Sequence, residues 1–99
     1  MNRDEALVIL SDSKDELREK FGVKSIAVFG STARNEAQSG SDVDVLVEFD
    51  SRAEIGLFKF IRLQWQLEEL LENKVDLVTR GGLFPQLKDS ILKEAVYVS

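Results

Sequence analysis

Three aspartates are spaced so that their carboxylates can work together. Asp42 and Asp44 are separated by one valine in a segment of alternating polar and apolar residues, typical of a half-buried strand. Side chains alternate between the faces of a strand, so both carboxylates lie on one face, about 7 Å apart along the strand. Asp76 has apolar neighbours in another predicted strand, 74–79. If the two strands are neighbours, the three carboxylates meet.

Such a cluster is a candidate site for hard cations. Carboxylates that lie close together repel one another and titrate abnormally unless a cation holds them. Ligands that are all oxygen favour Mg²⁺ or Mn²⁺ over zinc or copper. Two such ions about 3.5–4 Å apart suit in-line phosphoryl transfer, in which one activates the attacking hydroxyl and the other stabilises the leaving pyrophosphate. The third carboxylate can bind a metal ion and accept the proton of that hydroxyl.

Each aspartate alone also has a purely structural explanation. Asp42 follows a turn-like Ser-Gly-Ser and is as readily explained as the residue that begins the strand. Asp44 and Asp76 are harder to explain in this way, because aspartate is depleted inside strands and an uncompensated inward carboxylate is costly. The three together therefore carry the prediction of a metal site.

Gly30 and Ser31 follow a predicted buried strand, 25–29, and precede a brief predicted helix, 32–37. A turn of this kind points free backbone N–H groups and a hydroxyl at an anion, which suits a triphosphate. Glycine also permits close approach of the backbone to a ligand. The alternative is that Ser31 only caps the helix.

Arg34 lies in the first turn of that helix, where a cation opposes the helix dipole unless an anion is nearby. It either contacts nucleotide phosphates or pairs with a carboxylate such as Glu36 or Asp42, and pairing is slightly favoured. The glycine spacing matches neither the P-loop nor the dinucleotide pattern, so those two kinds of nucleotide site are not predicted.

The composition excludes several other kinds of chemistry. The 99 residues contain no cysteine and no histidine, which excludes disulfides, thiol catalysis, His-ligated metals and Ser-His-Asp catalysis. A net charge of −5 argues against direct binding of nucleic acid. The longest apolar run, 6–10, is too short for a membrane span, and no signal-peptide pattern is visible. A cytoplasmic protein without a membrane partner is expected.

Helices and strands alternate along the chain and would position these residues. A capping box of Asn2 and Glu5 predicts a leading helix that ends near Gly22, and Ser51 and Glu54 offer a second box. Strands are predicted at 25–29, 42–49, 74–79 and 96–98, and further helices at 32–37, 57–71 and 83–91. The order is α-β-α-β-α-β-α-β, and residues 1–99 are expected to form one α/β layered domain.

Two features outside this set have bland explanations. Glu48 lies on the aspartate face at the far end of its strand, where a solvated strand end is the simplest interpretation. Phe58 and Trp65 flank the apolar stripe of the helix at 57–71. They are either core residues, which is the commoner outcome, or an exposed aromatic edge that binds a partner.

The candidate site residues and their spacing resemble the signature of the DNA polymerase beta-like nucleotidyltransferases. That signature is carried by Gly30-Ser31, ten further residues, Asp42-Val43-Asp44, and then the strand with Asp76. The segments 29–34 and 41–47 resemble more specifically the minimal nucleotidyltransferases, or MNT proteins, and the likeness covers nearly the whole chain. It implies a single small α+β domain with a mixed sheet of about four strands and flanking helices.

The resemblance also implies an activity and a set of site residues. The activity is Mg²⁺-dependent transfer of a nucleoside monophosphate, AMP from ATP, to an acceptor hydroxyl. By this analogy two Mg²⁺ ions would be held by Asp42, Asp44 and Asp76, and Asp76 would also act as the base. The triphosphate would be held by Gly30, Ser31 and Arg34.

A protein partner follows from the same resemblance. Members of the family are often paired with an all-helical HEPN ribonuclease toxin, which they neutralise, in some cases by adenylylating a toxin tyrosine. The chain thus resembles an MntA-type antitoxin in a hetero-oligomer. Its small size leaves little room for an acceptor-binding region, and its negative charge would complement a basic RNA-cutting partner. Neutralisation by binding alone, and transfer to a small molecule or RNA, remain alternatives.

Overall fold

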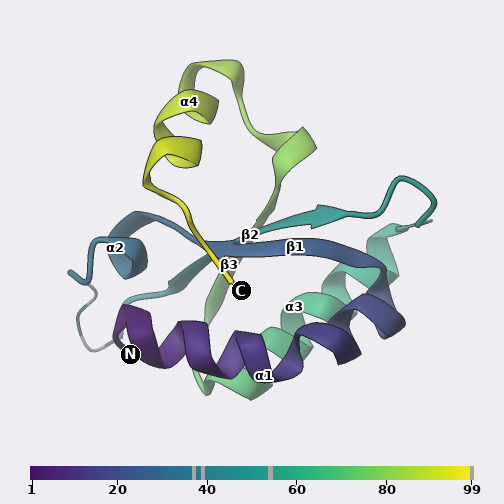
Figure 1. Ribbon diagram of the computed structural model, residues 1–99, viewed down its shortest axis with the longest axis horizontal. Coiled ribbons are helices and arrows are strands. Elements are labelled where there is room, and N and C mark those ends of the chain that lie inside the picture. Colours follow the sequence, from purple (N-terminus) through teal and green to yellow (C-terminus); the bar gives the residue numbers. More distant parts are fainter. Residues whose placement is uncertain (37, 39, 54, 99) are drawn as a thin grey trace.

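Four strands form one mixed sheet in the computed structural model, which describes residues 1–36, 38, 40–53 and 55–98 (Figure 1). The strands are β1 (Val23–Val28), β2 (Val43–Phe49), β3 (Val75–Thr79) and β4 (Val96–Tyr97). Their order across the sheet is β3-β2-β1-β4. β2 and β3 run parallel, whereas β1 is antiparallel to both β2 and β4. The predicted mixed sheet is therefore confirmed.

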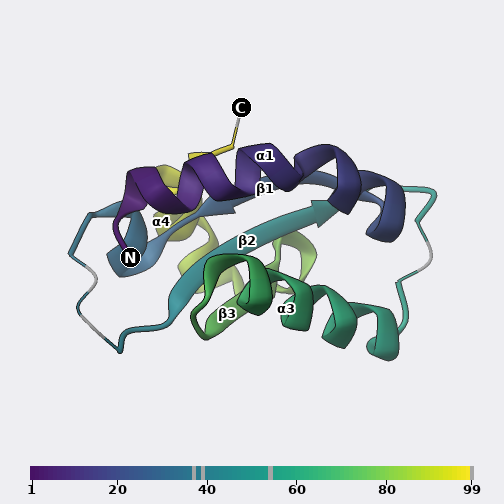
Figure 2. The same ribbon diagram turned by 90° about the horizontal axis from the view of Figure 1, so that it is seen from below.

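The two faces of the sheet carry different helices. α1 (Arg3–Phe21) and α3 (Leu57–Leu71) cover one face, and α4 (Pro85–Glu94) lies on the other (Figures 1 and 2). The main core lies under α1 and α3 and includes Ala6, Leu10, Leu17, Ile26, Val45, Val47, Leu63, Leu67 and Leu71. A smaller cluster of Ala27, Phe29 and Leu46 packs with Val78, Ile91 and Leu92 on the α4 side. Both faces of β2 are thus partly covered.

α1 begins and ends as its sequence predicts. The side chain of Asn2 accepts a hydrogen bond of 2.8 Å from the backbone N–H of Glu5, which satisfies one of the free donors of the first turn. Gly22 ends the helix in the left-handed conformation, with φ of 72°, and its N–H donates to the carbonyl of Arg18. This glycine carries the chain directly into β1.

The second helix differs from its prediction. α2 (Gly30–Ala33) begins two residues before the predicted segment 32–37 and contains four residues. Phe29, in extended conformation, precedes it, and Asn35 follows in the left-handed region with φ of 60°, which stops the helix. β1 likewise begins two residues earlier than predicted.

α3 begins at Leu57 after Gly56. The predicted capping box of Ser51 and Glu54 includes Glu54, which lies outside the described residues. The aromatic side chains that flank the apolar stripe are exposed, Phe58 by 80% and Trp65 by 65%. The commoner interpretation of these two residues as core is therefore wrong, because the buried face of α3 is formed by Leu63, Leu67 and Leu71, spaced by four residues.

The last helix is displaced along the chain from its prediction: α4 begins two residues later and ends three residues later than the predicted segment 83–91, and β4 ends one residue earlier than predicted. Pro85 occupies the first turn of α4, where its missing N–H costs no helical hydrogen bond. A 3₁₀ turn, Arg80–Gly82, connects β3 to the segment that precedes α4. Throughout the described residues, every helix is too short or too polar to cross a bilayer.

We expect Gly22→Ala to lower the free energy of unfolding by about 2–3 kcal/mol, because left-handed strain adds to a steric overlap. A Cβ at Gly22 would lie 2.6 Å from Cβ of Ala53. Gly40 also has a positive φ, of 90°, but a Cβ there would have no neighbour within 4 Å. Gly40→Ala is therefore the matched control and should cost about 1 kcal/mol in urea unfolding. Equal losses would remove the Ala53 contact from the explanation.

Candidate active site

The predicted aspartates lie at one end of two neighbouring strands. Asp44 of β2 and Asp76 of β3 are direct register partners, so their side chains share the face opposite α1 and α3. Asp42 precedes β2, and the neighbouring Val43 N–H donates to the carbonyl of Lys74 at 2.9 Å. The condition that the two strands be neighbours is met.

The surroundings of Asp44 shift the pKa of its carboxyl group. Burial raises the pKa of Asp44 above its ordinary value of 3.8, and the charges of Asp76 and Asp42 raise it further. The backbone N–H of Ser31 and the charge of Arg34 act in the opposite direction. Asp44 therefore lies within electrostatic range of both Asp76 and Asp42.

The carboxylates nevertheless do not converge into a finished ligand set. In the described part of the chain, no three acidic side chains are gathered closely enough to hold a metal ion. Asp42 and Asp76 are exposed, and Asp44 is half-buried. The donor chemistry fits a hard divalent cation, because carboxylate oxygens are its preferred ligands and mutual repulsion is what a cation would relieve.

Gly30 is required by the position of Asp44. Its φ is 60°, in the left-handed region, and a Cβ built on it would overlap Oδ2 of Asp44 and lie 3.0 Å from Cγ. The N–H of Phe29 donates to the carbonyl of Asp44 at 3.1 Å, and the N–H of Asp44 donates to the Thr32 hydroxyl at 3.4 Å. The start of α2 and the acidic end of β2 are therefore in direct contact.

The N–H groups of this turn are not free, contrary to the sequence-based expectation. The N–H of Gly30 donates a hydrogen bond to Oε1 of Glu94 at 2.8 Å, and the N–H of Ser31 donates one to the carboxylate of Asp44. The reason is that two carboxylates, Asp44 from β2 and Glu94 from α4, lie within hydrogen-bonding distance of the turn. The capping alternative for Ser31 is also wrong, because the N-cap position is Phe29 and Ser31 lies inside the helix.

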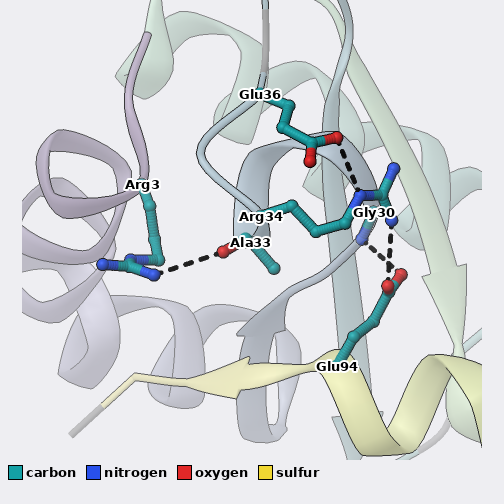
Figure 3. A network of polar contacts seen from close by, with 6 residues as sticks. All are labelled: Arg3, Gly30, Ala33, Arg34, Glu36 and Glu94. Carbon is teal, nitrogen blue, oxygen red and sulfur yellow. Dashed lines mark hydrogen bonds and ion pairs between the residues drawn. The ribbon is translucent and has the colours of Figure 1, made fainter.

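Arg34 pairs with carboxylates, as the sequence slightly favoured. Its Nε donates to Glu36 at 3.1 Å and its Nη1 to Glu94 at 2.9 Å (Figure 3). Hydrogen bonds to Glu36 and then Glu94 raise the pKa of Arg34 above its already high value. Among the described residues Glu94, not Asp42, is the second partner. No motif in the sequence pointed to Glu94, which is 60 residues from Arg34.

Glu48 lies at the other end of β2 and forms ion pairs there. Its carboxylate is 3.7 Å from Nζ of Lys24 and 3.6 Å from Nη1 of Arg80. These are exposed pairs of small energetic value. They agree with the interpretation of Glu48 as a strand-end residue.

Known proteins resemble this chain in both sequence and structure. A family model described as a nucleotidyltransferase domain matches residues 10–98. The protein adenylyltransferase MntA of Thermococcus cleftensis is 49% identical over 90 residues, 91% of this chain and 89% of that protein. A solved structure of a candidate minimal nucleotidyltransferase is 38% identical, with a TM-score of 0.78 over 97% of this chain and 95% of that one.

A more distant likeness shows the fold alone. A structure of the tri-AMPylated HEPN toxin of Shewanella oneidensis in complex with an MNT antitoxin contains a chain of similar fold. The TM-score is 0.66 at 18% identity, over 94% of this chain and 71% of that one.

The mixed sheet, its acidic face and a family match over most of the chain define an enzyme of the nucleotidyltransferase class. The chain belongs to the nucleotidyltransferase domain family, and its resemblance to the minimal nucleotidyltransferases is confirmed.

We expect Asp44→Asn to stabilise the metal-free fold at pH 7. The pKa of Asp44 is raised in the folded state, so its ionisation favours the unfolded chain. This penalty is absent below the ordinary value of 3.8 and grows as the pH rises through the raised pKa. Urea unfolding in EDTA from pH 3.5 to 7 should show a gain for Asp44→Asn that disappears at the acid end.

Asp12→Asn is the control for this measurement, because Asp12 is exposed on α1, across the sheet. Its effect should stay within about 0.5 kcal/mol at every pH. A stability loss for Asp44→Asn at pH 7 would contradict the assignment of Asp44 as a carboxylate under repulsion.

Proposed function

We propose that this chain transfers AMP from ATP to a tyrosine hydroxyl of a partner HEPN ribonuclease toxin in the cytoplasm, and so acts as an antitoxin. The observation that carries the proposal is the contact of Gly30 with Asp44, which joins the turn to the acidic face. A nucleotide held by the turn would have its reacting phosphate beside the carboxylates. The 49% identity to a protein adenylyltransferase supports AMP transfer to a protein.

All three aspartates would hold metal ions in this mechanism, and Asp76 would also act as the base. Asp42, Asp44 and Asp76 would hold two Mg²⁺ ions, which supply positive charge to the triphosphate and to the attacking oxygen. The acceptor oxygen attacks the α-phosphorus, the bond from that phosphorus to the β-phosphate oxygen breaks, and pyrophosphate leaves. Asp76, which is exposed, accepts the proton of the acceptor hydroxyl.

Ser31 and Arg34 bind the triphosphate. The Ser31 side chain lies in α2 next to Gly30 and is half-buried. Arg34 uses Nε and Nη1 in its ion pairs, but a guanidinium has five N–H donors, and its side chain is 47% exposed. The arginine can therefore contact a phosphate without losing either carboxylate. Gly30 contributes the close approach to Asp44 and not a phosphate contact of its own.

A toxin partner is supported by fold, size and charge. A chain of similar fold is found bound to an AMPylated HEPN toxin. This chain has 99 residues and a net charge of −5, which would steer it to a basic partner. The exposed side chains of Phe58 and Trp65 provide apolar area for a hetero-oligomer.

The direct test is the intact mass of the protein that co-purifies with this chain from its own cells. After incubation with this chain, Mg²⁺ and ATP, the partner should gain mass in whole AMP units. Asp42→Ala/Asp44→Ala should abolish the gain, because the carboxylates for the metal ions are lost. Glu48→Gln, on the same face of β2 but at its far end, is the matched control and should transfer AMP normally.

A tight complex with no mass gain would contradict the catalytic mechanism and leave neutralisation by binding. Gain of AMP on a small molecule or an RNA in the same extract, and not on the protein, would contradict the acceptor class.

We expect Ser31→Ala to weaken ATP binding about fivefold, because a hydrogen bond from a neutral hydroxyl to phosphate is lost. Titration calorimetry with Mg²⁺ and ATP measures the affinity. Ser90→Ala, on the exposed surface of α4, serves as control, and both variants should unfold in urea within about 0.5 kcal/mol of the wild type. Loss of stability without loss of affinity would show that Ser31 is only structural.

A further inference from the structure

Glu94 joins the end of α4 to the turn that carries Gly30 and Ser31. One oxygen of its carboxylate accepts the Gly30 N–H at 2.8 Å, and the other accepts Nη1 of Arg34 at 2.9 Å (Figure 3). The Glu94 side chain is 31% exposed, so both bonds are partly shielded from water. A carboxylate that uses both oxygens on two different partners fixes the position of each relative to the other.

Strand register places Glu94 there. β4 pairs with β1 so that Val96 stands opposite Val28. Gly30 follows Val28 by two residues, and Glu94 precedes Val96 by two, so the antiparallel register brings Glu94 opposite Gly30. On its other side, β1 brings Gly30 against Asp44. The turn therefore lies between two carboxylates from opposite sides.

α2 needs such support from outside. A helix of four residues cannot stabilise itself, because nucleation is costly and few internal hydrogen bonds form. At the other end of the helix, Arg3 of α1 donates from its guanidinium to the carbonyl of Ala33 at 3.4 Å and from its backbone to Asn35 at 3.1 Å. Glu94 is the counterpart of Arg3 at the end where the nucleotide is proposed to bind.

Arg34 depends on Glu94 for its orientation. A long arginine side chain loses about 2 kcal/mol of rotamer entropy when it is fixed. Glu36 is only two residues away in the same segment of the chain, whereas Glu94 anchors the guanidinium to a separate helix. The pair holds the guanidinium beside the Gly30 turn before any ligand arrives, and its charge already acts on Asp44.

We infer that Glu94 is a positioning residue for nucleotide binding: it holds the Gly30 turn and orients Arg34 toward the triphosphate. The inference rests on the proposed function, because it takes the turn as the triphosphate site. Through Glu94, α4 thus determines the geometry of the Gly30-Ser31 turn, although the two are far apart in the sequence.

The sign of the charge effect makes the inference testable. ATP is an anion, so removal of any nearby carboxylate should tighten its binding if general electrostatics alone mattered. A positioning role predicts weaker binding when Glu94 is neutralised. Glu48→Gln removes the same charge at the far end of the sheet face and is the matched control.

Titration calorimetry with Mg²⁺ and ATP, in the absence of any acceptor, provides the measurement. Glu94→Gln keeps an oxygen for the Gly30 N–H but places an N–H group against Arg34, and should weaken ATP binding about fivefold. Glu94→Ala loses both contacts and should weaken it about tenfold or more. Glu48→Gln should leave the affinity unchanged or slightly tighter. Glu48→Gln and Glu94→Gln should both keep the urea midpoint of the wild type to within a small shift, whereas Glu94→Ala should lower it because both supports of the α2 turn are lost.

A double-mutant cycle separates positioning from general support of the fold. In the Arg34→Ala background, Glu94→Gln should have little further effect on ATP affinity, because its target is gone. An equal loss in both backgrounds, wild-type affinity in Glu94→Gln, or tighter binding would overturn the inference. Tighter binding would instead make Glu94 a competitor of the phosphates for the same donors.

The proposed function and this inference fail in different ways. If the wild-type chain binds ATP but no partner gains AMP, the transfer reaction is wrong and the affinity series still decides the role of Glu94. If the wild type transfers AMP but Glu94→Gln retains its affinity, only the positioning role falls.

Discussion

The close approach of Asp44 to the backbone of Gly30 is the contact on which the site depends. Only a residue without a side chain can adopt a φ of 60° there and leave room for the carboxylate. The contact joins the end of β1 to the acidic end of β2 and brings the first residues of α2 beside Asp44. A side chain at position 30 would displace the Asp44 carboxylate from its place beside the turn.

The hydrophobic face of the sheet holds β2 in the register that this arrangement requires. Val43, Val45 and Val47 of β2 are buried against α1 and α3, which determines the register and therefore the face on which Asp44 lies. Burial and two neighbouring negative charges raise the pKa of Asp44, and the backbone N–H of Ser31 and the charge of Arg34 offset this only in part. Such a local conflict is typical of functional sites, where chemistry takes precedence over local stability.

The sheet face opposite α1 and α3 carries acidic residues and adjoins an arginine and a short helix, α2, which α1 and α4 hold in place. Arg3 and Glu94 contact α2 at opposite ends, and these hydrogen bonds support a helix of only four residues. Residues near both ends of the chain thereby meet at the site.

The sequence by itself determined the kinds of elements and the chemistry available to them. Alternation placed Asp44 on the polar face of its strand, although β2 begins at Val43 and leaves Asp42 just before the strand. Asn2 and Gly22 delimited α1, and the residue types predicted carboxylate chemistry. These signals depend on neighbours within a few positions. The tertiary structure alone decided that Asp76 stands beside Asp44, that α2 begins at Gly30, and that Glu94 holds a turn 64 residues away. Register and packing between distant segments decide such contacts, and no local pattern encodes them.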